Sequence, residues 1–149
     1  MNARRALVAL ACMLALLAPR LAAAQGRPAP LENFVASVAR MWAAGDANGV
    51  AALAPGDDRM VLDLGDGRAE ATEARHVAAA LRELFRDRTT LGVRQTQANI
   101  AGGQPVRGFG ELSWTSRPRG VTDSESSTVY IGAVWENNAW RIRELRVLR

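Results

Sequence analysis

Two hydrophobic periods divide this chain, and their order constrains its fold more than any other feature. Apolar residues follow the period of an α-helix from Leu31 to Gly45 and again over residues 72–87. After residue 91 they alternate with the period of a β-strand. Helices placed largely ahead of a run of consecutive strands predict an α+β domain, in which the helices pack on one antiparallel sheet.

The first helix is predicted from Leu31, because large apolar residues fall on one of its faces. That face carries Leu31, Phe34, Val35, Val38, Met41 and Trp42. Pro30 suits the first turn and Gly45 the C-terminal stop. A short helix over residues 46–54 and a third helix from an N-cap at Thr72 to Asp87 complete the helical part.

Six strands are predicted, at residues 60–64, 68–71, 91–101, 106–116, 128–135 and 140–148. In the fourth of these segments alternation places Leu112 and Trp114 on one face and Phe109 on the other. The apolar positions of the last strand change parity, which predicts a bulge near Arg143-Glu144. We therefore expect the order helix, helix, strand, strand, helix and four strands, with a strongly curved antiparallel sheet of five to six strands.

The N-terminus is typical of an export signal. Arg4 and Arg5 precede an apolar run over residues 6–18, and small residues at 22–24 follow. The run is too short to span a bilayer, so we expect cleavage between Ala24 and Gln25 and no integral membrane span afterwards. The predicted layout is a signal peptide (1–24), a disordered leader (25–30) and one domain (31–149), in a periplasmic or secreted protein.

Cleavage would change the chemistry that the chain can carry. It removes Cys12, the only cysteine, and with it disulfide, thiol and thiolate-metal chemistry. It also removes three of the 19 basic residues (Arg4, Arg5 and Arg20), whereas all 15 acidic residues stay. A nearly balanced charge gives no reason to expect nucleic-acid binding.

The order of elements, together with two short stretches, resembles a known superfamily. Met41-Trp42-Ala43-Ala44-Gly45-Asp46, followed by Val50-Ala51-Ala52-Leu53, is similar to the helix–Gly-Asp–helix opening of nuclear transport factor 2-like proteins. The ending Glu144-Leu145-Arg146-Val147 resembles that of exported bacterial proteins in the domain of unknown function 4783 family. The resemblance implies a cone of three helices over a bent, cystatin-like sheet. It implies no single function, because this fold hosts isomerases, dehydratases, ligand binders and assembly modules.

Two residues are candidates for catalysis. The resemblance to ketosteroid-isomerase-like proteins implies that Asp63, at the end of the first strand, is a proton-abstracting base, but the first helix offers no matching tyrosine donor. His76, the only histidine, is a candidate acid or base of the dehydratase-like kind. The alternatives are a turn residue at Asp63 and a boundary residue at His76. An enzyme using either residue is the second hypothesis for function.

The leading hypothesis is a non-catalytic binding domain, because no convergent set of acid, base and donor accompanies the aromatic residues of the sheet. The residues most able to line a pocket in the cone are Trp42, Phe109, Trp114, Tyr130 and Trp135. Its ligand would be a small apolar or amphipathic molecule, or a protein partner on the sheet. A structural module or homodimer is a third hypothesis. No cofactor is expected, and no metal, because the acidic residues 57, 58, 63 and 66 lack the spacing of a calcium loop.

Overall fold

A computed structural model describes residues 27–149, so the predicted signal peptide and its cleavage site at Ala24 and Gln25 lie outside the described residues. Three helices and six strands follow one another in the predicted order. They are α2 (Leu31–Ala44), α3 (Ala47–Ala51), β1 (Arg59–Asp63), β2 (Glu70–Glu73), α4 (Ala74–Asp87), β3 (Arg88–Gly102), β4 (Arg107–Pro118), β5 (Glu125–Glu136) and β6 (Ala139–Leu148). Among these residues no helix is long and apolar enough to cross a membrane.

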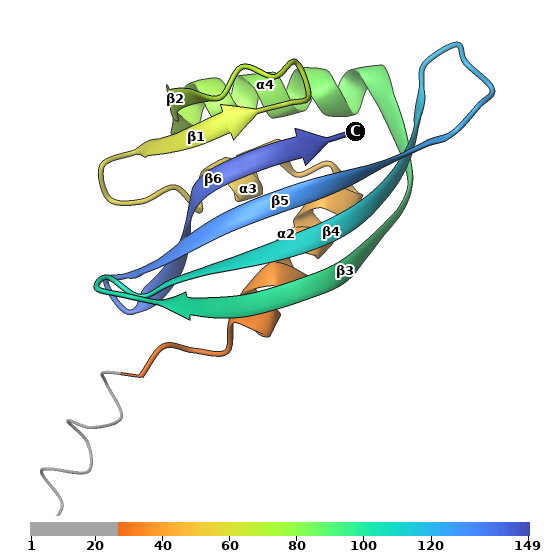
Figure 1. Cartoon of the computed structure of the whole chain (residues 1–149). Helices are drawn as coiled ribbons and strands as arrows, with labels where there is room; N and C mark the ends of the chain where they lie inside the picture. The colour runs from red at the N-terminus through yellow and green to blue at the C-terminus, as the bar shows by residue number, and fades with distance from the viewer. Residues whose placement is uncertain (1–26) are drawn as a thin grey trace, which may run out of the picture.

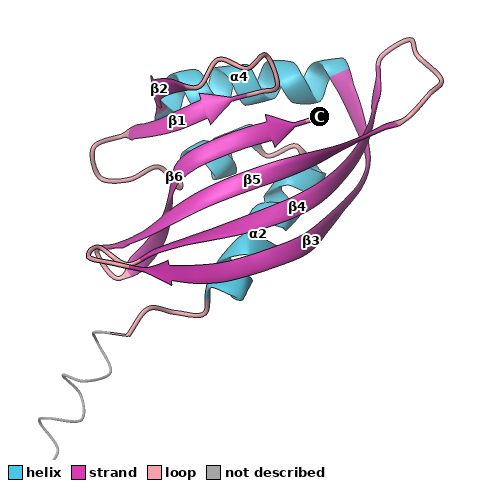
Figure 2. Ribbon diagram, viewed as in Figure 1, coloured by secondary structure: helices cyan, strands magenta, loops and turns pink. Residues whose placement is uncertain are grey.

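The six strands form one open sheet in the order β2-β1-β6-β5-β4-β3. The helices cover one face of this sheet, and the opposite face carries none of the described helices (Figures 1 and 2). The prediction of a purely antiparallel sheet is wrong, because β1 pairs with β6 in parallel, with Val61 opposite Glu144 and Leu62 opposite Leu145. The sheet is therefore mixed, and β2 and β3 are its two edges.

The start of the third helix also differs from the prediction. Thr72 does not cap α4, because residues 70–73 pair with β1 as an antiparallel strand, with Thr72 opposite Met60. The helix begins at Ala74, directly after that strand. Pairing with a neighbouring strand satisfies more backbone groups than one side-chain cap can, so tertiary contacts override the local signal.

The core lies between the helices and the covered face of the sheet. The predicted apolar face of α2 is buried at Leu31, Val35, Val38 and Trp42. Gly45 ends this helix in the left-handed conformation, with φ of 68°, which glycine adopts without steric cost. The helix lies directly over Gly108 and Gly110 of β4. A Cβ atom at Gly110 would be 2.8 Å from Cγ1 of Val35, so the absence of side chains there permits the close approach.

Candidate functional site: a groove on the open face of the sheet

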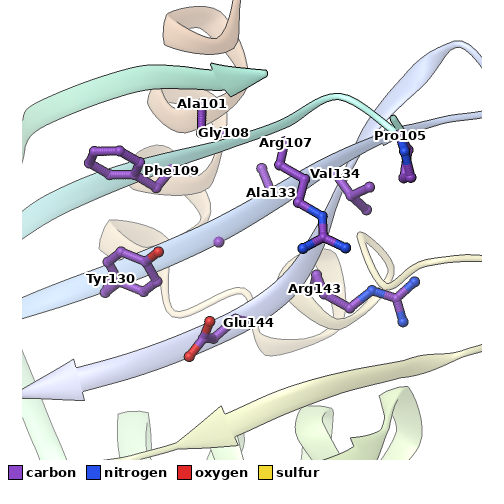
Figure 3. A pocket seen from close by; sticks show the side chains of 11 residues that line it. Ala101, Pro105, Arg107, Gly108, Phe109, Tyr130, Ala133, Val134, Arg143 and Glu144 are labelled. Carbon is purple, nitrogen blue, oxygen red and sulfur yellow. The ribbon is translucent and has the colours of Figure 1, made fainter. Parts of the chain in front are cut away.

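The uncovered face of the sheet carries a groove of about 450 Å³ over β4, β5 and β6. Side chains alternate between the two faces of each strand, so those that line the groove point away from the core. In β4 the side chain of Leu112 is fully buried among the helices, and Phe109 points the other way and is half-buried. Figure 3 shows the lining side chains standing on the open face, with the helix behind the sheet. The groove is therefore separate from the core.

Two aromatic rings form one end of the groove. Phe109 of β4 and Tyr130 of β5 are stacked, with ring centroids 6.2 Å apart and an angle of 19° between the ring planes. Gly132 lies directly opposite Phe109 in the β4–β5 register. Because Gly132 has no side chain, the surface beside the two rings is hollow, and a Cβ atom there would be 3.0 Å from Cβ of Glu144.

Charged side chains line the other part of the groove, together with small apolar residues such as Pro105 and Val134. Arg107 reaches into it from the start of β4, and Arg143 and Glu144 come from β6 (Figure 3). Arg143 occupies the predicted bulge, since Gly132 pairs with Glu144 whereas the next residue, Ala133, pairs with Ile142. An extra residue in one strand re-aims the side chains beside it, which here places Arg143 and Glu144 together at the groove.

Acidic neighbours hold Arg143 in place. Its Nη1 atom is 2.8 Å from Oδ2 of Asp57, and its Nη2 atom is 3.9 Å from Oε2 of Glu136. The hydrogen bond from Arg143 lowers the pKa of Asp57. Glu144 is paired in turn with Arg146.

Tyr130 has an altered ionisation. Partial burial raises the pKa of the Tyr130 phenol, and the nearby carboxylate of Glu144 adds to the effect. Both causes disfavour the phenolate. The groove therefore presents Tyr130 as a neutral hydroxyl, able to donate or accept a hydrogen bond.

The five predicted pocket residues fall into three places. Trp42 and Trp114 are fully buried and pack edge to face at 5.5 Å, so they fill the core. Phe109 and Tyr130 line the groove on the opposite face. Trp135 is half-buried at the end of β5 and contacts Trp140 at 5.4 Å, beside the segment that leads into α2.

The two catalytic candidates lie apart from the groove. The Oδ1 atom of Asp63 accepts hydrogen bonds from the backbone N–H groups of Gly65 (2.9 Å) and Gly67 (3.2 Å). Its carboxylate, which is largely buried, thus holds the β1–β2 turn together. His76 is exposed on α4 and borders a separate shallow depression with Asp66 and Glu70. Among the described residues no group of acidic, histidine or cysteine side chains is arranged to hold a metal ion.

Sequence reasoning missed four groove residues: Arg107, Gly132, Arg143 and Glu144. Alternation in β4 signals that Phe109 faces away from Leu112, so the open face could have been predicted to carry an aromatic residue. The contribution of Gly132 depends on its register against Phe109, and that of Arg143 on the bulge. The bulge itself is predicted from the last strand alone, but which residues of neighbouring strands lie beside it is not.

Comparison with known proteins supports the fold but indicates no function. No family model and no curated protein matches the sequence. Among solved structures, the chain is similar to a DUF4783 family protein from Bacteroides ovatus, with a TM-score of 0.62, 16% identity, and coverage of 82% of this chain and 96% of the other. A DUF4783 family protein from Bacteroides uniformis gives a TM-score of 0.62 at 11% identity, over 75% and 93% of the two chains. A domain of unknown function with a cystatin-like fold from Nostoc punctiforme gives 0.58 at 14%, over 74% and 69%.

This chain has a cystatin-like fold. The resemblance stated from the sequence is thus confirmed at the level of the fold, and the neighbours include the DUF4783 family proteins that it named. Within residues 27–149 this cystatin-like domain is an α+β structure with a six-stranded mixed sheet that does not close.

Proposed function

We propose that this protein is an exported, non-catalytic domain that binds a small amphipathic molecule in the groove of the open sheet face. The observation that carries the proposal is the stacked pair Phe109 and Tyr130 beside the hollow at Gly132. Aromatic surface next to a few fixed polar groups is the usual composition of a small-molecule site. The arginine and glutamate side chains of the groove supply those polar groups.

Two further observations favour binding over catalysis. The carboxylate of Asp63 is engaged by two backbone N–H groups, and this turn role accounts for its position. His76 borders a different depression, so the acid–base candidates and the aromatic groove do not share one site. Trp42 and Trp114 pack against each other in the core, which favours a ligand site outside the core.

Removal of the Tyr130 ring is expected to weaken binding of a neutral apolar probe. We expect Tyr130→Ala to reduce the affinity for N-phenyl-1-naphthylamine by at least about fivefold, because half of the aromatic surface is lost. The increase in probe fluorescence on titration with protein measures the affinity.

Two controls separate the ring from other effects. Tyr130→Phe keeps the ring and should bind the probe as the native protein does. Thr128→Ala changes a residue on the same strand and face but outside the groove, and should be neutral. Equal affinities for the native protein and Tyr130→Ala, or no binding by the native protein, would contradict the proposed site.

Export is the second part of the proposal and has its own measurement. The intact mass of the protein recovered outside the cytoplasm of the cells that make it should correspond to a chain that begins at Gln25. Substitution of Ala24 with a bulky residue such as tryptophan should leave the unprocessed chain, since signal peptidases read small residues before the cleaved bond. Native protein that keeps residues 1–24 in the cytoplasm would refute export.

A further inference from the structure

The groove has an excess of positive charge, and this excess lies at Arg107. Glu144 is paired with Arg146, and Arg143 is paired with Asp57 and Glu136. Arg107 differs from both. Within residues 27–149 no carboxylate lies within ion-pair distance of its guanidinium, although the side chain lines the groove.

The unpaired guanidinium and the aromatic rings lie at different ends of the same groove. Arg107 begins β4 opposite Val134, two residues before Phe109 on the same face of the strand. Figure 3 shows its side chain extending across β5 toward the strand of Arg143, with the rings of Phe109 and Tyr130 at the other end. A molecule that lies along the groove therefore contacts the aromatic rings at one end and the guanidinium groups of Arg107 and Arg143 at the other.

The acidic groups define the orientation of such a molecule. At the aromatic end, burial and then the carboxylates of Glu144 and Glu111 raise the pKa of Tyr130, whereas Arg146 lowers it. Because Arg146 is itself paired with Glu144, this end offers no unpaired cation. An anionic group placed there would have to compete with Glu144 for Arg146, whereas beside Arg107 it would meet a guanidinium that has no carboxylate within ion-pair distance. Arg143, fixed by its acidic neighbours, adds a second donor that does not have to be ordered on binding.

We propose that the groove selects a planar apolar molecule that carries one anionic oxygen group, a carboxylate, sulfonate or phosphate. Its rings lie on Phe109 and Tyr130, and its anionic group receives hydrogen bonds from the guanidinium of Arg107. Arginine suits this role because its planar donors match the oxygen pairs of such groups. The inference rests on the proposed binding function, whose aromatic end a neutral apolar probe tests separately.

A matched pair of fluorescent probes tests the two statements separately. 1-Anilinonaphthalene-8-sulfonate has the ring system of N-phenyl-1-naphthylamine with an added sulfonate. At low ionic strength the native protein is expected to bind the sulfonate probe about tenfold more tightly than the neutral probe, as one charge-assisted contact allows. Arg107→Gln should lower the affinity for the sulfonate probe about tenfold relative to that for the neutral probe, and so abolish this preference.

Arg117→Gln is the control for net charge. Arg117 is an exposed arginine near the other end of β4 and does not line the groove, so its replacement should preserve the preference. In the native protein, 1 M salt should also weaken the preference, because salt screens the attraction between solvent-exposed charges. Circular dichroism of each variant verifies that the fold is retained.

The outcomes distinguish the inference from the proposal beneath it. Failure of the native protein to bind the neutral probe refutes the binding function itself. Equal affinity of the native protein for the two probes is consistent with the aromatic site, but it refutes the proposal that the groove prefers an anionic ligand. A preference that survives in Arg107→Gln, or a variant that weakens both probes equally, refutes the role of Arg107.

Discussion

Replacement of Trp42 with alanine is expected to lower the free energy of unfolding by about 3–5 kcal/mol, the largest effect of a single substitution that we predict. Trp42 projects from α2 and contacts Phe85 of α4 edge to face at 5.1 Å and Trp114 of β4 at 5.5 Å. Its removal leaves a cavity where both helices meet the sheet. Chemical denaturation followed by far-UV circular dichroism measures the loss.

Trp42 and Trp114 differ in the hydrogen bonding of their indole N–H groups, so their substitutions can be compared within one cluster. Among the described residues the indole N–H of Trp42 has no acceptor, whereas that of Trp114 donates to Oγ1 of Thr90 at 3.1 Å. A buried donor without a partner gives up part of the stability gained by burial. Trp42→Phe should therefore destabilise less than Trp114→Phe, and the reverse order would contradict this account of the core.

Substitution of Gly110 with valine is expected to cost about 3 kcal/mol, at the upper end of the penalty for overpacking. The new Cβ atom would enter the space of Val35, with 2.8 Å to its Cγ1 atom, and the two added methyl groups would push α2 away from β4. The strand preference of valine over glycine acts in the opposite direction but is worth less than 1 kcal/mol. The shift in the denaturation midpoint at constant slope measures the effect.

Gly92→Val is the matched control, since a Cβ atom at Gly92 of β3 would meet no atom within 4 Å. This variant should be neutral or slightly stabilising. Addition of Val35→Ala to Gly110→Val should recover part of the loss, because the two residues compete for one volume. Equal losses for the Gly92 and Gly110 variants would show that the close approach of α2 to the sheet is not what requires glycine.

Local patterns predicted most of the elements, and non-local pairing accounts for what they missed. The face of α2, its end at Gly45 and the bulge beside Arg143 follow from spacing within single segments. The parallel pairing of β1 with β6 joins segments that are far apart in the sequence, such as Val61 and Glu144, so no local signal specifies it. The expected cap at Thr72 is instead part of the edge strand β2, because Thr72 pairs with Met60 in the antiparallel β1–β2 hairpin.

The groove was predictable only in part, for a related reason. The sequence predicts that Phe109 and Tyr130 line a pocket in the cone with Trp42 and Trp114, whereas in the structure they line the groove on the opposite face of the sheet. Alternation separates Phe109 from Trp114, yet it does not say which face the helices cover. The hollow at Gly132 and the placement of Arg107 beside it depend on registers between strands, which a single sequence does not contain.

The central place of β6 in the sheet has a consequence for the order of folding. It is the last of the described elements to be synthesised, and it lies between β5 and β1. Before β6 is synthesised, no backbone hydrogen bonds link the β3–β5 meander to the β1–β2 hairpin. The edges of β5 and β1 that β6 will pair with are then unpaired. Pairings of such long range form slowly. A nascent chain that still lacks β6 therefore cannot join these two pieces into one sheet.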